Sequence, residues 1–248
     1  MGRFATDSGG EFRSFPGVTC FRSPLPFLLF NMAFVEDAAI LDRGALNAVH
    51  AFYRELEVEW CLTVPPRLTH AFETTMKHVA VSSRRTVPEM VLPREPIRTW
   101  PSPADLFVRR VRDLDELREW VRVASIAFDV GDHRFFDPLA SPAALDGSGM
   151  IHYIGLIDGR PVATSSLYIL NGVAGVHAVG TLPEVRGRGF GAAMTAVALR
   201  DGFSQGCHTT ALQATPSGFP VYFRMGFRHV FDFEEWVVPA DARDVWKA

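Results

Sequence analysis

The sequence predicts a mixed α/β (α+β) fold with helices packed on a mixed sheet. Three alternating apolar segments between residues 151 and 181 are joined by Asp158-Gly159 and Asn171-Gly172. Both dipeptides accept the positive φ angles of tight hairpin turns, which predicts an antiparallel meander. Apolar residues recur at helical spacing over 114–128. A glycine-rich segment, 186–191, follows the last meander strand and precedes another helical pattern.

Composition excludes several classes of protein. Apolar residues make up 48% and charged residues 21% of the 248 residues, so the chain can bury a sizeable core. The net charge of −3 disfavours a broadly basic nucleic-acid surface, and no nucleic-acid partner is expected. Cys20, Cys61 and Cys207 are far apart without a CxxC pair, so neither a disulfide framework nor a metal site is expected. These features favour a cytoplasmic protein.

The most apolar early run is too short to cross a membrane. It extends from Pro24 to Val35 and contains two prolines, whereas a spanning helix needs about 20 residues. No membrane partner is therefore expected.

Proline clustering suggests a domain boundary. Pro93, Pro96, Pro101 and Pro103 follow one another closely, and proline opposes regular backbone pairing. We expect a mobile tail at 1–15, a small N-terminal unit at 16–100 and a larger domain at 101–248.

The N-terminal unit is predicted to alternate strands and helices. Asp37 is the expected cap of its first helix, which runs to about residue 55. Short apolar runs and helical periodicity predict, in order, a strand at 27–35, this helix, a strand at 58–64, a helix at 67–78 and a strand at 87–92.

The C-terminal domain has clearer signals. Asp113 with Glu116 forms a capping-box-like start for the helix over 114–128. Gly206 and Gly226 are suited to end two later helices. The predicted elements are a strand at 106–111, this helix, strands at 151–157, 161–170 and 173–181, a helix at 189–205, a strand at 209–214, a short helix ending at Gly226, and strands at 227–231 and 233–238.

The segment Arg186-Gly187-Arg188-Gly189-Phe190-Gly191 predicts a phosphate cradle. Glycines allow backbone N–H groups to converge, and the helix N-terminus adds about half a positive charge. A Walker loop is excluded because no GxxxxGK[ST] string exists. A dinucleotide motif using Gly187, Gly189 and Ala192 fits weakly, because it follows an antiparallel meander and Leu212-Gln213-Ala214 stands where an acidic ribose ligand belongs.

A third alternative is the acetyl-CoA loop [QR]xxGx[GA]. Residues 179–191 resemble the strand, pyrophosphate loop and helix of the GNAT (GCN5-related) N-acetyltransferases, and Tyr222 to Phe227 match the family's YxxxGF motif. The resemblance covers about residues 105–238, including strand order. The N-terminal unit is similar to the later half of a GNAT fold but lacks an RxxGxG loop.

The resemblance implies a GNAT acyl-CoA N-acyltransferase fold and direct acetyl transfer from acetyl-CoA to an amine. It implies that Tyr222 protonates the departing sulfur, whereas simple packing on the short helix is the alternative. The backbone of Val179, Gly180 and Thr181 would pair with the pantetheine arm. The residues implied to hold the pyrophosphate are Arg186, Gly187, Arg188, Gly189, Phe190, Gly191 and Ala192.

Three further positions follow from the resemblance. Thr215 stands seven residues before Tyr222, where many GNATs carry a cofactor-contacting asparagine. Its hydroxyl or that of Ser217 could replace that contact, and Gly218 would allow close approach of the cofactor. His177 matches a histidine base of one GNAT branch, with a structural histidine on the sheet as an equal alternative.

The sequence thus predicts an acetyl-CoA-dependent N-acetyltransferase acting on a small-molecule amine, with no metal. Asp129, Asp132 and His133 could bind a cationic amine, although a solvated acidic loop is the simpler interpretation. The alternatives are a catalytically silent acetyl-CoA sensor, and an enzyme that uses a longer acyl-CoA or a protein amine. A homodimer is possible by analogy.

Overall fold

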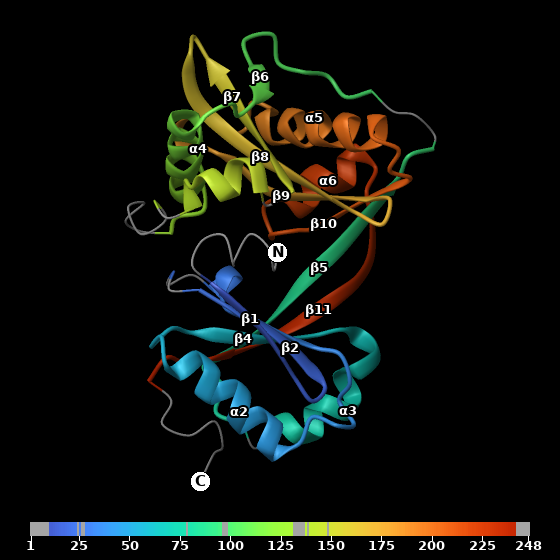
Figure 1. Ribbon diagram of the computed structural model, residues 1–248. Helices are drawn as coiled ribbons and strands as arrows, with labels where there is room; N and C mark the ends of the chain where they lie inside the picture. The colour runs from blue at the N-terminus through green and yellow to red at the C-terminus, as the bar shows by residue number, and fades with distance from the viewer. Residues whose placement is uncertain are drawn as a thin grey trace. The chain divides into compact units, whose positions relative to one another are not determined.

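A computed structural model describes residues 10–23, 25, 28–77, 79–95, 99–130, 137, 139–147 and 149–241. The chain forms two compact units (Figure 1). Unit 1 comprises Met1–Val87 and Phe231–Ala248, and unit 2 comprises Pro88–Val230. Across the described residues, every helix is too short or too polar to pass through a bilayer.

Unit 1 contains a mixed sheet with the strand order β1-β2-β3-β4-β11. β3 and β4 are parallel, whereas β1–β2, β2–β3 and β4–β11 are antiparallel. Tyr53 stacks on Trp60 within its core, with ring centroids 4.7 Å apart. The elements are β1 (Glu11–Phe15), β2 (Val18–Arg22), η1 (Leu28–Phe30), β3 (Met32–Val35), α2 (Arg43–Arg54), β4 (Trp60–Val64), α3 (Pro66–Met76) and the later part of β11 (Arg228–Val238).

The N-terminal hairpin corrects the expectation of a mobile tail through residue 15. Residues 11–15 form β1, whose register with β2 pairs Phe15 with Val18. Pro16 and Gly17 make the turn, and Gly17 has a φ of 74°. A Pro-Gly pair between two aromatic-containing segments favours a turn, and the expectation of a mobile tail did not take this pair into account. Residues 1–9 lie outside the described part of the chain.

The first helix begins later than the sequence suggested. Asp42, rather than Asp37, is the N-cap, and its side chain accepts a hydrogen bond from the Ala45 backbone N–H at 2.8 Å. Asp37 instead accepts a hydrogen bond from the Ala39 N–H at 2.9 Å within a bend. Both aspartates are good caps, so helical periodicity alone did not separate them.

Unit 2 contains strands in the order β5-β10-β9-β8-β7-β6, with both parallel and antiparallel pairs. β9 and β10 are parallel, whereas the pairs β5–β10, β8–β9, β7–β8 and β6–β7 are antiparallel. The elements are the later part of β5 (Ser83–Pro93), β6 (Phe107–Arg110), α4 (Leu114–Ala127), η3 (Ala143–Gly147), β7 (Met150–Ile157), β8 (Arg160–Leu170), β9 (Val173–Thr181), η4 (Pro183–Val185), α5 (Phe190–Ser204), β10 (Thr209–Gln213), α6 (Phe219–Met225) and the start of β11.

The unit limits differ from the boundary expected at residue 100. Residues 89–93 of β5 pair with β10 in unit 2, and residues 234–238 of β11 pair with β4 in unit 1. β11 also replaces the two separate strands expected at 227–231 and 233–238. Asp232 separates the two expected strands in the sequence, but it is part of the single strand β11, so this polar residue does not end the strand.

The meander and the helix before it match the sequence expectation. Asp158 and Asn171 have φ angles of 49° and 50°, and the glycines that follow them have φ angles of 79° and 75°. Positive φ at both central residues is the geometry of a type I′ hairpin turn. Asp113 caps α4 by accepting a hydrogen bond from the Glu116 N–H at 2.9 Å.

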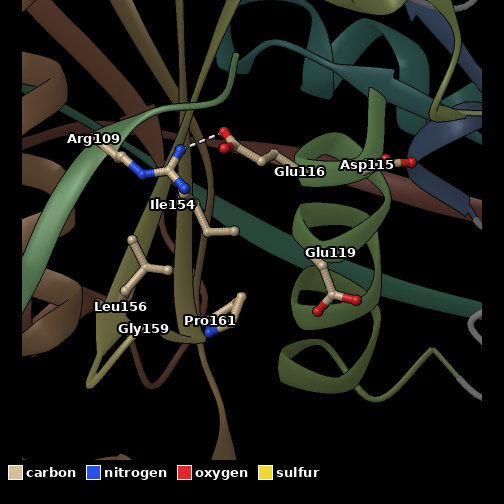
Figure 2. Close-up of a pocket in the computed structure, with 8 residues that line it drawn as sticks. All are labelled: Arg109, Asp115, Glu116, Glu119, Ile154, Leu156, Gly159 and Pro161. Carbon is tan, nitrogen blue, oxygen red and sulfur yellow. Dashed lines mark hydrogen bonds and ion pairs between the residues drawn. The ribbon is translucent and has the colours of Figure 1, made fainter. Parts of the chain in front are cut away.

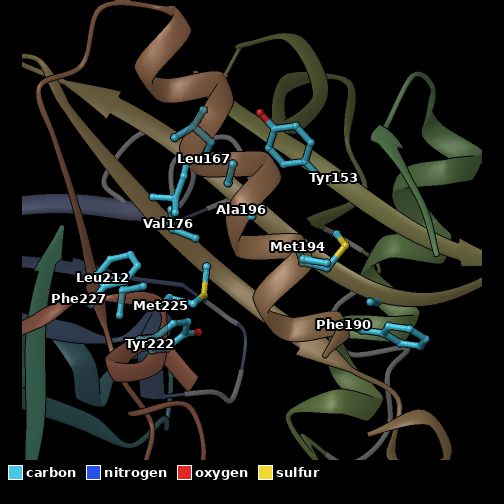
Figure 3. Close-up of a cluster of buried hydrophobic side chains, with 14 of the residues drawn as sticks. Tyr153, Leu167, Val176, Phe190, Met194, Ala196, Leu212, Tyr222, Met225 and Phe227 are labelled. Atoms are coloured by element: carbon cyan, nitrogen blue, oxygen red, sulfur yellow. The ribbon is translucent and has the colours of Figure 1, made fainter. Parts of the chain in front are cut away.

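The core of unit 2 lies between its strands and the helices α5 and α6. Figure 3 shows Leu167 and Val176 against α5, and Leu212 beside Phe227 and Met225. These side chains are buried, with exposed fractions of at most 4%. This packing fixes which face of each strand turns away from α5, and that opposite face carries the polar residues described below.

Candidate active site

The β9 strand contains a bulge in the middle of the unit 2 sheet. Its pairing with β8 joins Ser166 to His177 and Thr164 to Gly180, so two residues of β9 oppose Ser165 alone. Ala178, one of the two, has a φ of 49°, and its carbonyl accepts a hydrogen bond from Thr164 Oγ1 at 2.9 Å. An extra residue of this kind bends a strand and redirects the side chains after it.

Beyond the bulge, each side chain of β9 points to the face opposite to the one that the alternation before the bulge would give it. A Cβ on Gly180 would lie 2.8 Å from Ala127 Cβ of α4, so Gly180 turns toward α4 and the strand approaches this helix closely. Val179 lies on the α5 side, since its Cγ1 would be 4.0 Å from a Cβ on Gly191. The bulge therefore aims the last residues of β9 at the start of α5.

β9 and β10 separate after Gly175, three residues before the bulge at Ala178. Their parallel pairing covers Thr209–Ala211 with Val173–Gly175, although β9 continues to Thr181. Within the described residues, no further pairing joins the two strands. The edge of β9 that faced β10 is therefore without a strand neighbour at Val179, Gly180 and Thr181, where an extended ligand could pair, although the Thr181 carbonyl also accepts a hydrogen bond from Arg186 at 3.2 Å.

The glycine loop follows β9 in the chain, where α5 begins. Gly187 and Gly189 have φ angles of 78° and 83°, which glycine adopts without strain. A Cβ on Gly187 would meet nothing within 4 Å, and one on Gly189 only Pro103 Cγ at 3.8 Å. Open space in front of main-chain N–H groups at a helix N-terminus suits an anion.

Two arginines hold the loop in place. The Arg186 guanidinium donates to the carbonyls of Ala127 at 2.8 Å and Thr181 at 3.2 Å, which ties the loop to the end of α4. Arg188 forms an ion pair with Asp105 and lies over the Phe190 ring, 4.8 Å from its centroid. Both side chains are exposed, so each retains access to solvent beside the loop.

Tyr222 lies on α6 beside the core (Figure 3). Its side chain is 8% exposed, and burial raises the pKa of its phenol to about 12, against a hydrogen bond with Thr195 that lowers it. Thr195 in turn donates to the Gly191 carbonyl at 2.8 Å. The phenol is therefore linked through one hydroxyl to the first turn of α5.

Residues 113–227 match the family model of the acetyltransferase (GNAT) family. The chain carries a GNAT acetyltransferase domain. No curated protein matched the sequence.

Solved structures extend the similarity of fold to nearly the whole chain. A GCN5-related N-acetyltransferase from Kribbella flavida is 19% identical, with a TM-score of 0.69 over 96% of this chain and 95% of that one. One from Sphaerobacter thermophilus is 13% identical, with a TM-score of 0.63 over 91% and 81%. A tandem GNAT protein from the clavulanic acid biosynthesis pathway is 16% identical, with a TM-score of 0.62 over 95% and 85%. The predicted GNAT fold with a GNAT-like N-terminal unit is thereby confirmed.

Two predicted cofactor contacts of the GNAT domain have other partners here. Thr215 Oγ1 accepts a hydrogen bond from the Gly218 N–H at 3.1 Å and lies 3.2 Å from Ser217 Oγ, so it stabilises the turn before α6. A Cβ on Gly218 would lie 2.9 Å from Tyr222 Cε2, so this glycine makes room for the tyrosine ring. Their contact with a cofactor stays a prediction.

His177 precedes the bulge and shares a row with two other polar residues of the GNAT domain. The register aligns it with Ser166 of β8 and His152 of β7, and His152 Nδ1 is 2.8 Å from Ser166 Oγ. Burial lowers the pKa of His177 to about 4, so its ring is neutral at pH 7. Nε2 would lie 2.9 Å from a Cβ on Gly175, which places the ring over the paired, closed end of β9. Its role as base stays a prediction.

Glu89 is a titratable residue that no sequence motif singled out. It stands on β5 opposite Gln213, at the end of β10 beside the opening. Burial raises the pKa of its carboxyl to about 7, against a hydrogen bond with Gln213 that lowers it. In the sequence, Glu89 is the single acid within the apolar run Val87 to Leu92. A carboxylate is costly to bury unless it is paired and hydrogen-bonded, so an acid at this position could have been noticed.

The GNAT domain also has a pocket of ≈ 300 Å³ between α4 and the β6–β7–β8 edge (Figure 2). Figure 2 shows Arg109 directed at Glu116, with which it forms an ion pair. Asp115 and Glu119, which also line the pocket, pair with Arg118 and Arg122. Each acid is thus neutralised by an arginine, and the pocket lies on a different edge from the β9–β10 opening.

The loop proposed to bind a cationic amine is described only in part. Asp129 has a φ of 54° just after α4, whereas Asp132 and His133 lie outside the described residues. Among the residues that are described, no three His, Cys, Asp or Glu side chains are grouped closely enough to hold a metal ion.

Proposed function

We propose that this protein is an acetyl-CoA-dependent N-acetyltransferase that transfers an acetyl group directly to a small-molecule amine. One observation carries the proposal: β9 parts from β10 after Gly175, and the bulge at Ala178 then redirects the last residues of β9 toward the open glycine loop of α5. This continuous path joins unpaired strand backbone to a cluster of helix N-terminal amides. It suits a ligand that has a peptide-like arm and a diphosphate.

The residues present fit acetyl-CoA. A Cβ on Gly187 would be in open space, and one on Gly191 would meet only Val179 Cγ1 at 4.0 Å, so diphosphate oxygens can approach the backbone N–H groups. The proposed pyrophosphate contacts are the N–H groups of residues 187–192, with Arg186 fixing the loop from behind. Residues 179–181 would hold the pantetheine arm as an added strand. Bound acetyl-CoA supplies the acetyl group as an activated thioester.

Tyr222 is the proposed general acid. A phenol with a pKa of about 12 stays protonated throughout the physiological pH range, so it can always donate a hydrogen bond. It is a weak acid, and its main contribution is to stabilise the negative charge that develops on sulfur. A positioned acid of this kind contributes about 10²–10⁴-fold to the rate.

The proposal is tested with the full chain by calorimetry and by thiol release. Acetyl-CoA is titrated first, and coenzyme A release is then followed over a panel of small amines, aminoglycosides and lysine peptides. We expect binding, and turnover with a small amine. Binding without turnover on any amine would favour a sensor, and preferential turnover of longer acyl-CoA donors would change the donor. The absence of acetyl-CoA binding would overturn the proposal.

A further inference from the structure

We propose that Glu89 of β5 is the general base that takes the proton from the acceptor amine, directly or through one water. This inference rests on the proposed function, because it names the residue that prepares the acceptor at the same site. Glu89 lies outside the segment that matches the family model, residues 113–227. The acid would therefore be supplied to the GNAT domain by a strand that precedes it in the chain.

The strand register places Glu89 at the opening. Gln213, the last residue of β10, is opposite Glu89, and the next residue, Ala214, donates its N–H to the Pro88 carbonyl at 2.9 Å. β5 therefore supports β10 beyond Ala211, where β10 has already left β9. Adjacent strands are about 4.8 Å apart, so Glu89 stands one strand away from the edge that borders the opening.

Side-chain alternation places Glu89 on the face away from α5. Met90 is opposite Leu212, and both are buried in the core on the α5–α6 side. The neighbours Glu89 and Gln213 must point to the other face. On β9, Val176 belongs to the same core, which assigns His177 to the same face as Glu89.

α4 and β11 both contribute residues to the face of Glu89. α4 presents Trp120, Ala127 and Phe128 to this face of the sheet, and none of them is charged. On β11, His229 contacts Phe219 of α6 and so belongs to the opposite face, whereas alternation along the strand turns the charged residues Arg228 and Asp232 to the face of Glu89.

The other groups that share this face are on β5 and β9. Arg85, four residues earlier on β5, is neutralised by Glu235. The ring of His177 lies over Gly175, at the closed end of the opening. Burial therefore dominates at Glu89 and raises its pKa to about 7, while Gln213 supplies a neutral hydrogen bond. A carboxylate with this pKa is matched to proton abstraction near neutral pH.

With Glu89 as the base, every proton of the reaction is accounted for. Glu89 takes one proton from the ammonium form of the acceptor, whose nitrogen lone pair then forms the C–N bond as the C–S bond breaks. Tyr222 gives a proton to the sulfur, and the second N–H proton, lost as the amide forms, restores the phenol through water. Glu89 returns its proton to solvent, so the net products are amide, coenzyme A and one proton.

The test compares Glu89→Gln, which keeps the size of the side chain and a hydrogen bond to Gln213, with the wild-type chain. We expect kcat/KM for the best amine to fall about 10²–10⁴-fold, with acetyl-CoA affinity by calorimetry unchanged. The wild-type kcat/KM should rise with pH and level off above about pH 7, and the variant should lack this rise. Glu55→Gln, an exposed carboxylate at the end of α2, is the control and should retain wild-type kinetics.

A second measurement does not depend on turnover. Infrared difference spectra between the wild type and Glu89→Gln, recorded without ligands, should show a protonated carboxyl band that disappears near pH 7. A variant that folds with wild-type kcat/KM, or a Glu89 carboxyl that titrates near 4, would overturn the inference. A wild-type chain that fails to bind acetyl-CoA would remove the proposed function itself, whereas an active Glu89→Gln variant would remove only the base.

Discussion

The Tyr222 ring packs directly against the backbone of Gly218. A Cβ at this glycine would lie 2.9 Å from Tyr222 Cε2, closer than real Cβ contacts allow. Gly218 has ordinary helical angles of φ −78° and ψ −35°, so the need for glycine is steric and not conformational. The two residues, at the start and within α6, therefore fix the position of the proposed acid.

Gly218→Ala should displace the Tyr222 ring. Overpacking of a buried contact costs about 1–3 kcal/mol of stability, and a displaced phenol no longer meets the sulfur. We expect kcat to fall at least about tenfold with little change in acetyl-CoA affinity, measured by steady-state kinetics and calorimetry. Gly44→Ala is the control, because Gly44 is exposed on α2 and its Cβ would meet only the Asp42 side chain. Unchanged kcat in Gly218→Ala would show that the ring position is not critical.

Tyr222→Phe should separate catalysis from binding. The change removes one hydroxyl and leaves Thr195 bonded to the Gly191 carbonyl. We expect kcat to fall about 10²–10⁴-fold, with an unchanged acetyl-CoA Kd. Tyr153→Phe is the control for loss of a buried phenol, since Tyr153 donates to Asp201 away from the opening. Equal kcat values in Tyr222→Phe and wild type would assign Tyr222 to packing alone.

Gly189→Glu should abolish acetyl-CoA binding. The new side chain would occupy the space in front of the α5 amides and place a negative charge there. Gly189 has a φ of 83°, so the substitution also strains the backbone by about 1–2 kcal/mol. Gly159→Glu provides the control, because Gly159 has a φ of 79° and open space around it in the β7–β8 turn. Both variants should lose similar stability, and only Gly189→Glu should lose the calorimetric signal.

Arg186→Lys should loosen the glycine loop. The arginine bridges two carbonyls, those of Ala127 and Thr181, and a lysine ammonium cannot reproduce this planar fork. We expect faster hydrogen exchange at residues 186–190 and a several-fold weaker acetyl-CoA affinity. Arg160→Lys, in an exposed ion pair with Glu184, is the control. Identical exchange rates in Arg186→Lys and wild type would contradict the bridging role.

Local signals explain why the C-terminal domain was predictable. Asp113 capped its helix as expected, and the Asp158-Gly159 and Asn171-Gly172 turns defined the meander, because each depends on residues adjacent in sequence. The glycine loop was predictable for the same reason, because its residues are also adjacent in sequence. Nearest-neighbour chemistry was sufficient wherever a single turn or cap determined the backbone.

Features that depend on distant partners were not predictable. β11 is continuous because residues 234–238 pair with β4, about 170 positions earlier in the chain. Glu89 acquires its environment from Gln213, and Gly218 is required by the Tyr222 ring. The bulge at Ala178 could not be predicted from the sequence. Its φ angle is positive, and positive φ angles are expected at glycine or asparagine and not at alanine.

The raised pKa of Glu89 predicts a specific dependence of stability on pH. The folded state binds this proton more tightly than the unfolded chain, because the carboxyl pKa is about 7 when folded, against an ordinary value of 4.5 for a glutamate in water. The protonated form therefore supports folding fully below about pH 4.5, and this support is lost as pH rises to about 7. Over this interval the loss amounts to at most about 3 kcal/mol.

Glu89→Gln lacks this titration, so it should become more stable than the wild type as the pH rises. Denaturant unfolding at pH 4.5, 6 and 8 measures the difference in unfolding free energy, which should grow with pH and stop changing above about pH 7.5. Glu55→Gln, at an exposed position, is the control for the removal of a carboxylate. A constant difference for Glu89→Gln would mean that its carboxylate remains charged and hydrated in the folded protein, which is incompatible with a base tuned by burial.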